Sequence, residues 1–377
     1  MDNENTHFRD NDSNCIIDNS TDTLLYGGTN GMIPSGVKAI NEYAFAAKNI
    51  TQVTIPEGVI TIGEHAFDGC NQLDEIAVAD TVTCIGAYAF AYCALSKVTV
   101  GKGVERVGSW CFATFGARAK PMELHISDLS AWCNIEFADE VANPLAEGLT
   151  KLYVDNKQIT ELIIPEDVEV IKDYVLSGNN HFTSIHIPAS VKSISSTALR
   201  GCPNVREITV DESNQYYFVE GNCLIEKATK TLVLGCKTSV IPQDKGIVRI
   251  GDNAFYNCML ESVTLPSTVT EIGERAFYNC RITSIELPAN LTTIGAQAFV
   301  MCKITEITIP AQVTYIGVNA FNGASLTSVT FNNPSGWQAF HEFFQQTEYF
   351  TTEQLSNTAT AAEYLTSTYK DYVWTRK

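Results

Sequence analysis

Six of the twelve cysteines stand at the same place in a repeated phrase of the sequence, and thiols are the residues here best able to do chemistry. They are Cys70, Cys93, Cys202, Cys258, Cys280 and Cys302. If the repeated units stack like neighbouring strands, consecutive thiols lie about 5 Å apart, a spacing that a disulfide tolerates. The last three form a run, however, and three thiols cannot pair completely. No CxxC pair is present, which weighs against zinc. We favour a small buried free thiol that fits its turn, with disulfides or a metal as alternatives.

The other polar motifs do not form a recognisable catalytic or metal site. The six histidines are dispersed, no HExxH is present, and His65 falls in a variable turn position that we expect to be exposed. The stretch DNDSN, residues 10–14, has calcium-loop spacing, but Cys15 and Thr21 replace the required Gly and Glu, so a polar loop is favoured. The stretch GKGVERVG at 101–108 lacks GxGxxG spacing and is expected to be a turn. We therefore expect no enzyme, no cofactor and no metal.

Composition limits the classes of partner. The chain has 377 residues, 45% of them hydrophobic, so it can bury a core. Its net charge of −18 repels phosphate backbones and anionic lipids, and Lys and Arg look scattered, with no stripe. We therefore expect no nucleic acid partner. We also expect no membrane insertion, because no apolar run is long enough to span a bilayer. The polar start lacks the plan of a signal peptide, and no anchor motif closes the chain.

These residues must be positioned by a repeat. The stretch LESVTLPSTVTEIGERAFYNCR at 260–281 recurs twice at intervals of 22 residues, and earlier copies begin near residues 50, 73, 95, 159 and 182. The unit is LxxVxLPxxVxxIGxxAFxxC. Its SVTL alternates as a half-buried strand does, its proline ends the strand, its Ile-Gly suits a turn, and AFxxC fits one helical turn. Stacked units would bury a continuous core and pair their strands in parallel, about 4.8 Å apart.

The pattern resembles the BspA-type leucine-rich repeats found in bacterial surface proteins. The resemblance covers about residues 30–331; the usual asparagine column is absent and Cys ends the AF turn, which marks the subtype. It implies an α/β leucine-rich repeat solenoid with a curved parallel sheet on one face, short helical turns and loops on the other, and β-hairpin insertions. It also implies a non-enzymatic, adhesin-like protein of the bacterial surface or secreted by the cell. Its partner would be a protein ligand, such as a host or neighbouring-cell surface protein.

The interruptions of the repeat predict the organisation of the chain. Residues 14–34 and 222–242 look alike, and each predicts two short strands around a polar turn. A further hairpin is predicted to turn at Asp155 and Asn156. The predicted regions are an N-terminal hairpin cap at 1–33, a solenoid at 34–331 with an irregular insert at 113–158 and a hairpin insert at 211–242, and a C-terminal cap at 332–377.

The C-terminal cap is expected to begin with a helix, because Trp337, Phe340 and Phe344 recur at i, i+3 and i+7. A solenoid needs a lid over its last coil, and we interpret the aromatic tail as that lid. A separate aromatic ligand platform is the alternative.

The outward positions of the predicted strands are the candidate binding face. These positions are rich in Ser, Thr and Glu and contain no aromatic or Arg cluster of the kind typical of interface hot spots. The candidate residues are Thr264, Glu286, Thr308, Thr330, Ser262, Ser284, Glu306, His186 and Glu207. Thr is also simply common in strands, so solubility alone is an alternative explanation.

Two other functions stay open at this point. The chain could be a structural spacer or envelope component. It could also be a carbohydrate-binding accessory protein, a hypothesis that depends on the tail aromatics Trp337, Tyr349 and Trp374.

Overall fold

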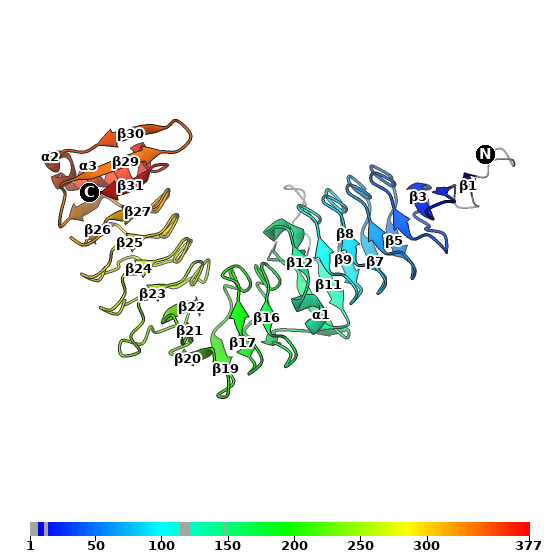
Figure 1. Ribbon diagram of the computed structural model, residues 1–377, viewed down its shortest axis with the longest axis horizontal. Coiled ribbons are helices and arrows are strands. Elements are labelled where there is room, and N and C mark those ends of the chain that lie inside the picture. The colour runs from blue at the N-terminus through cyan, green and yellow to red at the C-terminus, as the bar shows by residue number, and fades with distance from the viewer. Residues whose placement is uncertain (1–6, 11–13, 114–120, 147) are drawn as a thin grey trace. The chain divides into compact units, whose positions relative to one another are not determined.

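A computed structural model describes residues 7–10, 14–113, 121–146 and 148–377. The chain divides into two compact units, each a stack of coils (Figure 1). The N-terminal unit comprises residues 1–160, 164–181 and 193–199, and the C-terminal unit comprises 161–163, 182–192 and 200–377. Both are parallel β-solenoids with few helices, as the repeat predicts.

The first sheet of the N-terminal unit contains predicted strands and continues into the insert at 113–158, where the prediction of an irregular segment was wrong for residues 123–126. Its parallel strands are β5 (Gln52–Ile55), β7 (Glu75–Val78), β9 (Lys97–Val100), β11 (Glu123–Ile126) and β13 (Lys151–Val154). In β5, Val53 and Ile55 are buried whereas Gln52 and Thr54 are exposed, so one face of the strand meets the core. β14 (Lys157–Gln158) pairs antiparallel with β13. The predicted hairpin is confirmed, since its turn residues Asp155 and Asn156 both have positive φ.

A second sheet forms where the sequence predicts a turn. Three of its short parallel strands end on the Ile or Val that precedes Gly, namely β6 (Thr61–Ile62), β8 (Cys84–Ile85) and β10 (Arg106–Val107). They are flanked by β4 (Ala39–Ile40) and, in the insert, by β12 (Glu136–Phe137). The turn prediction for Ile-Gly was therefore wrong for Ile. Gly remains necessary because the coils approach so closely there: a Cβ on Gly86 would lie 2.5 Å from the backbone nitrogen of Glu64.

Hairpins and short pairs complete this unit. The predicted hairpin at 14–34 is confirmed as antiparallel β2 (Ile16–Asp18) and β3 (Thr23–Tyr26), with β1 (Phe8–Asp10) beside β2. The insert contributes α1 (Leu129–Cys133) and the 3-10 turn η1 (Glu140–Ala142). A separate pair consists of β16 (Val170–Ile171) and β18 (Ser193–Ile194).

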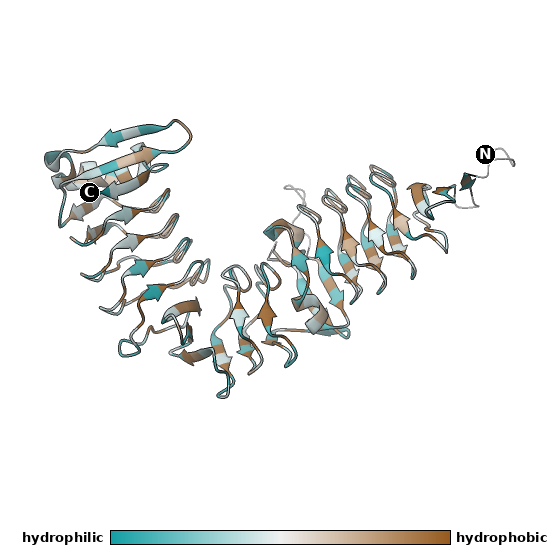
Figure 2. Ribbon diagram, in the orientation of Figure 1, coloured by the Kyte–Doolittle hydropathy of each residue, from teal (hydrophilic) through white to brown (hydrophobic). Residues whose placement is uncertain are grey.

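The AFxxC segments form consecutive tight turns and not the predicted helical turn. The reason is that their amides alternate between two kinds of bond. Ala66 N–H bonds within its own turn to the Gly63 carbonyl, whereas Phe67 N–H bonds across to the carbonyl of Ala89 in the next coil at 2.8 Å. The Phe rings consequently stack through the core, as Phe67 does on Phe90 with centroids 5.3 Å apart. Figure 2 shows apolar and polar residues alternating along the coils.

The C-terminal unit has three sheets. One contains β15 (Glu161–Ile163), β17 (Ser184–Ile187) and β19 (Glu207–Val210), and another pairs β26 (Glu306–Ile309) with β28 (Ser328–Phe331). The third sheet begins with β20 (Tyr217–Glu220) and the predicted hairpin, which is confirmed as β21 (Cys223–Glu226) and β22 (Thr231–Gly235). Its further strands are, in order, β23 (Arg249–Ile250), β24 (Glu271–Ile272), β25 (Thr293–Ile294), β27 (Tyr315–Ile316), β31 (Val373–Arg376), β29 (Trp337–His341) and β30 (Gln346–Tyr349).

Two predicted strands of this unit do not form. Residues 262–265 and 284–287 keep the alternating burial, with Leu265 and Leu287 inside, but they lie outside every ladder. Adjacent coils meet here through single bonds, such as Arg281 N–H to the Leu260 carbonyl at 2.8 Å. The turns and the third sheet hold these coils together in place of a strand ladder.

The tail closes the C-terminal unit. The helix predicted through Trp337, Phe340 and Phe344 was wrong, because this segment is β29 and the turn that leads to β30. Helical residues follow in α2 (Thr352–Ser356), α3 (Thr358–Glu363) and η2 (Tyr364–Thr368). β31 pairs with β27, and the buried rings of Trp337 and Trp374 pack around Phe331. The tail therefore covers the last coil; the region boundaries given above stay predictions.

Candidate functional site

The candidate face predicted from the outward strand positions lies wholly in the C-terminal unit. Eight of the nine residues are exposed, and His186 is half-buried with Nδ1 2.9 Å from the Thr209 hydroxyl. Five of them line one open hollow of about 590 Å³, which we call the strand-side hollow. Those five are Ser284, Glu286, Glu306, Thr308 and Thr330. Ser262 lines a different hollow, and Thr264 and Glu207 line neither.

The strand-side hollow has no catalytic constellation. Its charged lining consists of two carboxylates, Glu286 and Glu306, and the rest is hydroxyls, amide and aliphatic groups. A nucleophile needs a base within hydrogen-bond reach. Among the residues that line this hollow, none is a His, Cys, Lys or Arg. The hollow can accept and donate hydrogen bonds, which suits recognition.

The cysteines are confirmed as free thiols, all buried except the half-buried Cys84. Burial raises the pKa of Cys70 to about 11 and the pKa of Cys302 to about 12. The thiol of Cys280 also has a raised pKa, first because it bonds to Cys258 and then because it is buried. These thiols stay protonated at neutral pH, so they are poor nucleophiles and poor metal ligands. Within the described residues, no three His, Cys, Asp or Glu side chains gather as a metal site.

Sequence reasoning missed a stack of aromatic rings on the turns of the N-terminal unit. It consists of Tyr43, His65, Tyr88 and Trp110, which we call the aromatic stack. The ring centroids lie 4.7, 4.8 and 6.3 Å apart in that order, and the rings are within 10° of parallel. Tyr43 is 56% exposed and Trp110 37% exposed. His65, which we expected to be exposed, is half-buried because it lies between two tyrosines.

The local backbone explains the aromatic stack. Each of its residues immediately precedes the Ala or Cys of an AF-type turn and has φ between 53° and 59°. This left-handed conformation turns the four side chains the same way, so rings in successive coils meet. His65 is further held by Asp68, whose Oδ2 lies 2.7 Å from Nδ1. The same position in the C-terminal unit contains Asn253, Arg275, Gln297 and Asn319. Alignment of the repeats alone could have revealed that this position is aromatic in the N-terminal unit and polar in the C-terminal unit.

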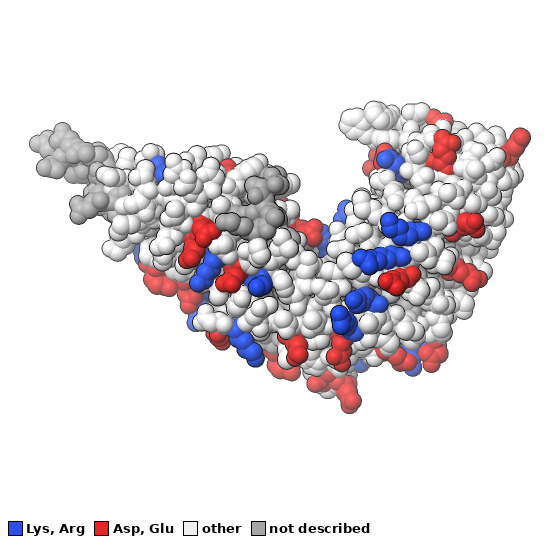
Figure 3. All heavy atoms as spheres, turned by 180° about the vertical axis from the view of Figure 1, so that it is seen from behind, with Lys and Arg blue, Asp and Glu red and all other residues white. Residues whose placement is uncertain are grey.

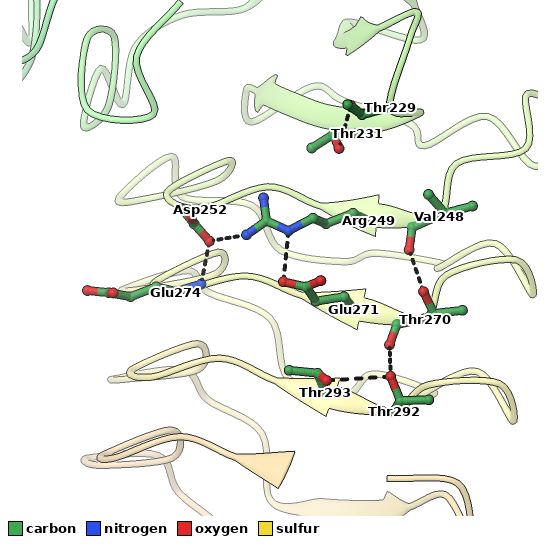
Figure 4. Close-up of polar contacts among 10 residues, drawn as sticks. All are labelled: Thr229, Thr231, Val248, Arg249, Asp252, Thr270, Glu271, Glu274, Thr292 and Thr293. Carbon is green, nitrogen blue, oxygen red and sulfur yellow. Dashed lines mark hydrogen bonds and ion pairs between the residues drawn. The ribbon is translucent and has the colours of Figure 1, made fainter. Parts of the chain in front are cut away.

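The surface of the third sheet of the C-terminal unit is polar, and its polar contacts are structural. Arg249 donates to Glu271 Oε1 at 2.8 Å and to Asp252 Oδ1 at 2.6 Å, and Asp252 also accepts the Glu274 amide (Figure 4). Beside them, the Thr270 hydroxyl donates to the Val248 carbonyl at 3.2 Å. Each of these bonds joins a side chain to the same or an adjacent coil. The charges are therefore paired, and the bonds stabilise the stack.

A group of basic residues contradicts the expectation that no stripe exists. Figure 3 shows Lys and Arg gathered on one face of the C-terminal unit. We call Arg206, Lys237, Arg281 and Lys303 the basic patch. Lys237 and Arg281 line one hollow, and backbone bonds place Lys303 beside Ile282, the residue after Arg281. The 22-residue spacing of Arg281 and Lys303 was visible in the sequence, but the approach of Lys237 to Arg206 depends on the hairpin insert, whose Thr238 hydroxyl donates to the Arg206 carbonyl.

The sequence comparison identifies the repeat. The family model for the BspA type leucine-rich repeat region matches residues 30–117, 150–229 and 234–362, in six copies and over more than half of the chain. This chain belongs to the BspA-type leucine-rich repeat family. Among curated proteins, none matches it.

Solved structures of bacterial leucine-rich repeat proteins share the fold of this BspA-type protein. A leucine-rich cell surface protein from Faecalibacterium prausnitzii has 21% identity and a TM-score of 0.54, over 88% of this chain and 96% of its own. The pneumococcal vaccine antigen PcpA has 17% identity and a TM-score of 0.53, over 87% of this chain and 82% of its own. Across the described ranges, no helix is both long and apolar enough to cross a bilayer.

Proposed function

We propose that this BspA-type protein is a non-enzymatic, adhesin-like protein at the bacterial surface or outside the cell. It would bind another protein, of a host or of a neighbouring cell. The aromatic stack is the single observation that supports this proposal most directly. The family and the cell-surface protein of similar fold support the location.

The aromatic stack has the properties of a binding hot spot. Tyr and Trp dominate such sites because they offer a large apolar area with a polar edge. The rings of Tyr43, His65 and Tyr88 lie face to face, so their edges and not their inner faces are presented to solvent. Because stacking already restricts these rings, they would lose little further side-chain entropy when a partner binds. A sugar ring, in contrast, needs an open aromatic face, and neither His65 nor Tyr88 offers one, because each is stacked on both sides.

The strand-side hollow is a second surface for the same function. Its hydroxyls and the carboxylates of Glu286 and Glu306 would form hydrogen bonds with a partner at the rim of an interface. The nine residues predicted from the sequence stay part of the proposal for this reason.

The burial of the tail tryptophans weighs against the carbohydrate hypothesis. Trp337 is 2% exposed and Trp374 1% exposed, so neither can stack on a sugar at the surface. Of the three aromatics, Tyr349 alone is exposed, at 72%. One ring is a weak platform, and we retain protein binding as the proposal.

The test replaces the rings without straining the turns. Asn tolerates the left-handed conformation and occupies the same turn position at Asn253 and Asn319. The variants Tyr43→Asn, Tyr88→Asn and Trp110→Asn therefore remove the rings and keep the backbone. The full chain is immobilised and assayed against a panel of purified extracellular-matrix and bacterial surface proteins. Tyr349→Asn is the control, because it removes an exposed aromatic ring from the C-terminal unit.

We expect a panel protein to bind with micromolar affinity, and each of the three ring removals to weaken binding by about tenfold or more. The control should bind as the unchanged chain does. If no panel protein binds, the structural spacer becomes the better hypothesis. If a protein binds and the three variants bind it equally well, the aromatic stack is not the site.

A further inference from the structure

The basic patch borders an open hollow of about 430 Å³ in the C-terminal unit, a volume within the range of ligand-binding clefts. Lys237 and Arg281 line it, together with hydroxyl and apolar residues. Arg206 lies next to it, since the Thr238 hydroxyl in its lining donates to the Arg206 carbonyl at 2.6 Å. The lining of the hollow therefore contains two cations, Lys237 and Arg281, and one carboxylate, Glu261.

The cations of the patch have no carboxylate of their own. Among the described residues, Lys237, Arg281 and Lys303 form no ion pair and no side-chain hydrogen bond. Other cations of this unit are paired: Lys245 lies 3.0 Å from Glu220, and Arg249 contacts two carboxylates. In a chain with a net charge of −18, a group of unpaired cations is a local exception. Their ammonium and guanidinium donors are available to a ligand.

Two of the three hydroxyl groups that line the hollow are already used as donors. The Thr238 hydroxyl donates to the Arg206 carbonyl, and the Ser239 hydroxyl donates to the Asn222 carbonyl at 2.6 Å. These two oxygens can only accept further bonds, so Ser262 supplies the remaining hydroxyl donor of the lining. The charged donors are Lys237 and Arg281, and the ligand that matches them brings negatively charged acceptors such as carboxylates.

The remaining lining distinguishes an acidic peptide from a dense polyanion. Val240 is 73% exposed and Met259 37% exposed beside the cations, which favours a ligand with apolar side chains between its charges. Glu261 also lines the hollow and would repel a closely charged chain. The net charge of −18 penalises sulfated glycans and nucleic acid over a longer range.

We propose that the basic patch and its hollow bind an extended acidic segment of a protein partner, in which Asp or Glu alternates with apolar residues. The inference specifies the chemistry of a partner and rests on the proposed protein-binding function. It concerns a surface of the C-terminal unit, whereas the test of the aromatic stack concerns the N-terminal unit. A failure of one is therefore distinguishable from a failure of the other.

The experiment measures binding of a fluorescein-labelled peptide in which Glu alternates with Leu and Val, by fluorescence anisotropy with the full chain. The same peptide with Gln in place of Glu and a heparin hexasaccharide are the competing probes. The double variant Lys237→Gln with Arg281→Gln removes the central charges, and Lys237→Arg with Arg281→Lys retains them. Lys102→Gln removes one exposed and unpaired charge from the N-terminal unit as the control.

We expect the Glu peptide to bind with a Kd below about 1 mM, and more weakly as salt is raised. The double Gln variant should weaken binding by about five- to tenfold, as expected for two exposed charge pairs. The charge-retaining variant should stay within about twofold of the unchanged chain, as should Lys102→Gln. Four outcomes would each overturn the proposal. The Glu and Gln peptides could bind equally well, or the Glu peptide could bind the double Gln variant as tightly as the unchanged chain. Heparin alone could bind, or no probe could bind.

Discussion

The thiol of Cys280 donates a hydrogen bond to the carbonyl oxygen of Phe255, one coil earlier, with Sγ 3.0 Å from the oxygen. The same bond joins Cys302 to Phe277 at 3.1 Å and Cys70 to Phe45 at 3.1 Å. Each thiol thus adds a second hydrogen bond to a buried Phe carbonyl that already accepts an amide of its own turn, as Phe255 does from Cys258 N–H at 3.3 Å. A thiol is a small weak donor that fits this buried position. The cysteine column is therefore structural, and its buried thiols stay protonated.

The raised thiol pKa values predict a loss of stability at alkaline pH. The folded pKa of Cys70 is about 11, above its ordinary value of 9.0, so the folded state holds the proton more tightly than the unfolded state. The contribution is complete below pH 9 and is lost as pH rises toward 11. We expect the stability difference between the unchanged chain and Cys70→Ser to be constant from pH 7 to about 8.5. From there to pH 11, urea unfolding should show the unchanged chain losing free energy of unfolding relative to Cys70→Ser. A pH-independent difference would contradict the prediction.

Gly86→Ala tests the close approach of coils in the second sheet. The new Cβ would lie 2.5 Å from the nitrogen of Glu64, which belongs to the neighbouring backbone and cannot turn aside. We expect a loss of about 1–3 kcal/mol in the free energy of unfolding, typical of overpacking. Thr61→Ala, at an exposed position of the same sheet, should change stability by less than about 0.5 kcal/mol. Similar losses for the two variants would show that the contact is relaxed.

Phe277→Ala tests the inner ring stack. Phe277 is fully buried, with its ring 5.3 Å from Phe255 and 5.5 Å from Phe299. Its removal leaves a cavity that the stacked coils cannot fill, and we expect a loss of about 3–5 kcal/mol by urea unfolding. The exposed Thr264→Ala should cost little. Equal effects would mean that the inward and outward assignments are wrong.

Trp337→Ala tests the lid over the last coil. The Trp337 ring is buried, its Nε1 donates to the Asn333 carbonyl at 3.0 Å, and it contacts Phe331 edge to face. We expect a loss of about 3–5 kcal/mol, measured by thermal unfolding followed by circular dichroism. Tyr349→Ala, on the partner strand of the same hairpin, should be nearly neutral because that ring is exposed. A stable Trp337→Ala protein would show that the tail is not needed as a lid.

The repeat alone determined which residues share a column, and therefore the solenoid, the buried Phe and Cys columns and the three hairpins. A period of 22 residues brings Phe277 beside Phe255 and Phe299 whatever the details of the coil, because each unit must bury its apolar side on the next. Ladder formation was not determined in this way. The segments 262–265 and 284–287 alternate like β26, yet they form no strand, since the turns and the other sheet already hold these coils.

The tertiary structure decided how the two candidate surfaces are formed. Repeat register places the four aromatic residues in one column, but the left-handed backbone at Tyr43 and its equivalents directs their rings toward one another. The basic patch depends on the hairpin insert, which returns Lys237 and Thr238 to the side of Arg206 and of the column of Arg281. Sequence periodicity describes contacts between equivalent positions. Contacts made by an insert, or by side chains that a turn redirects, arise from the path of the backbone in space.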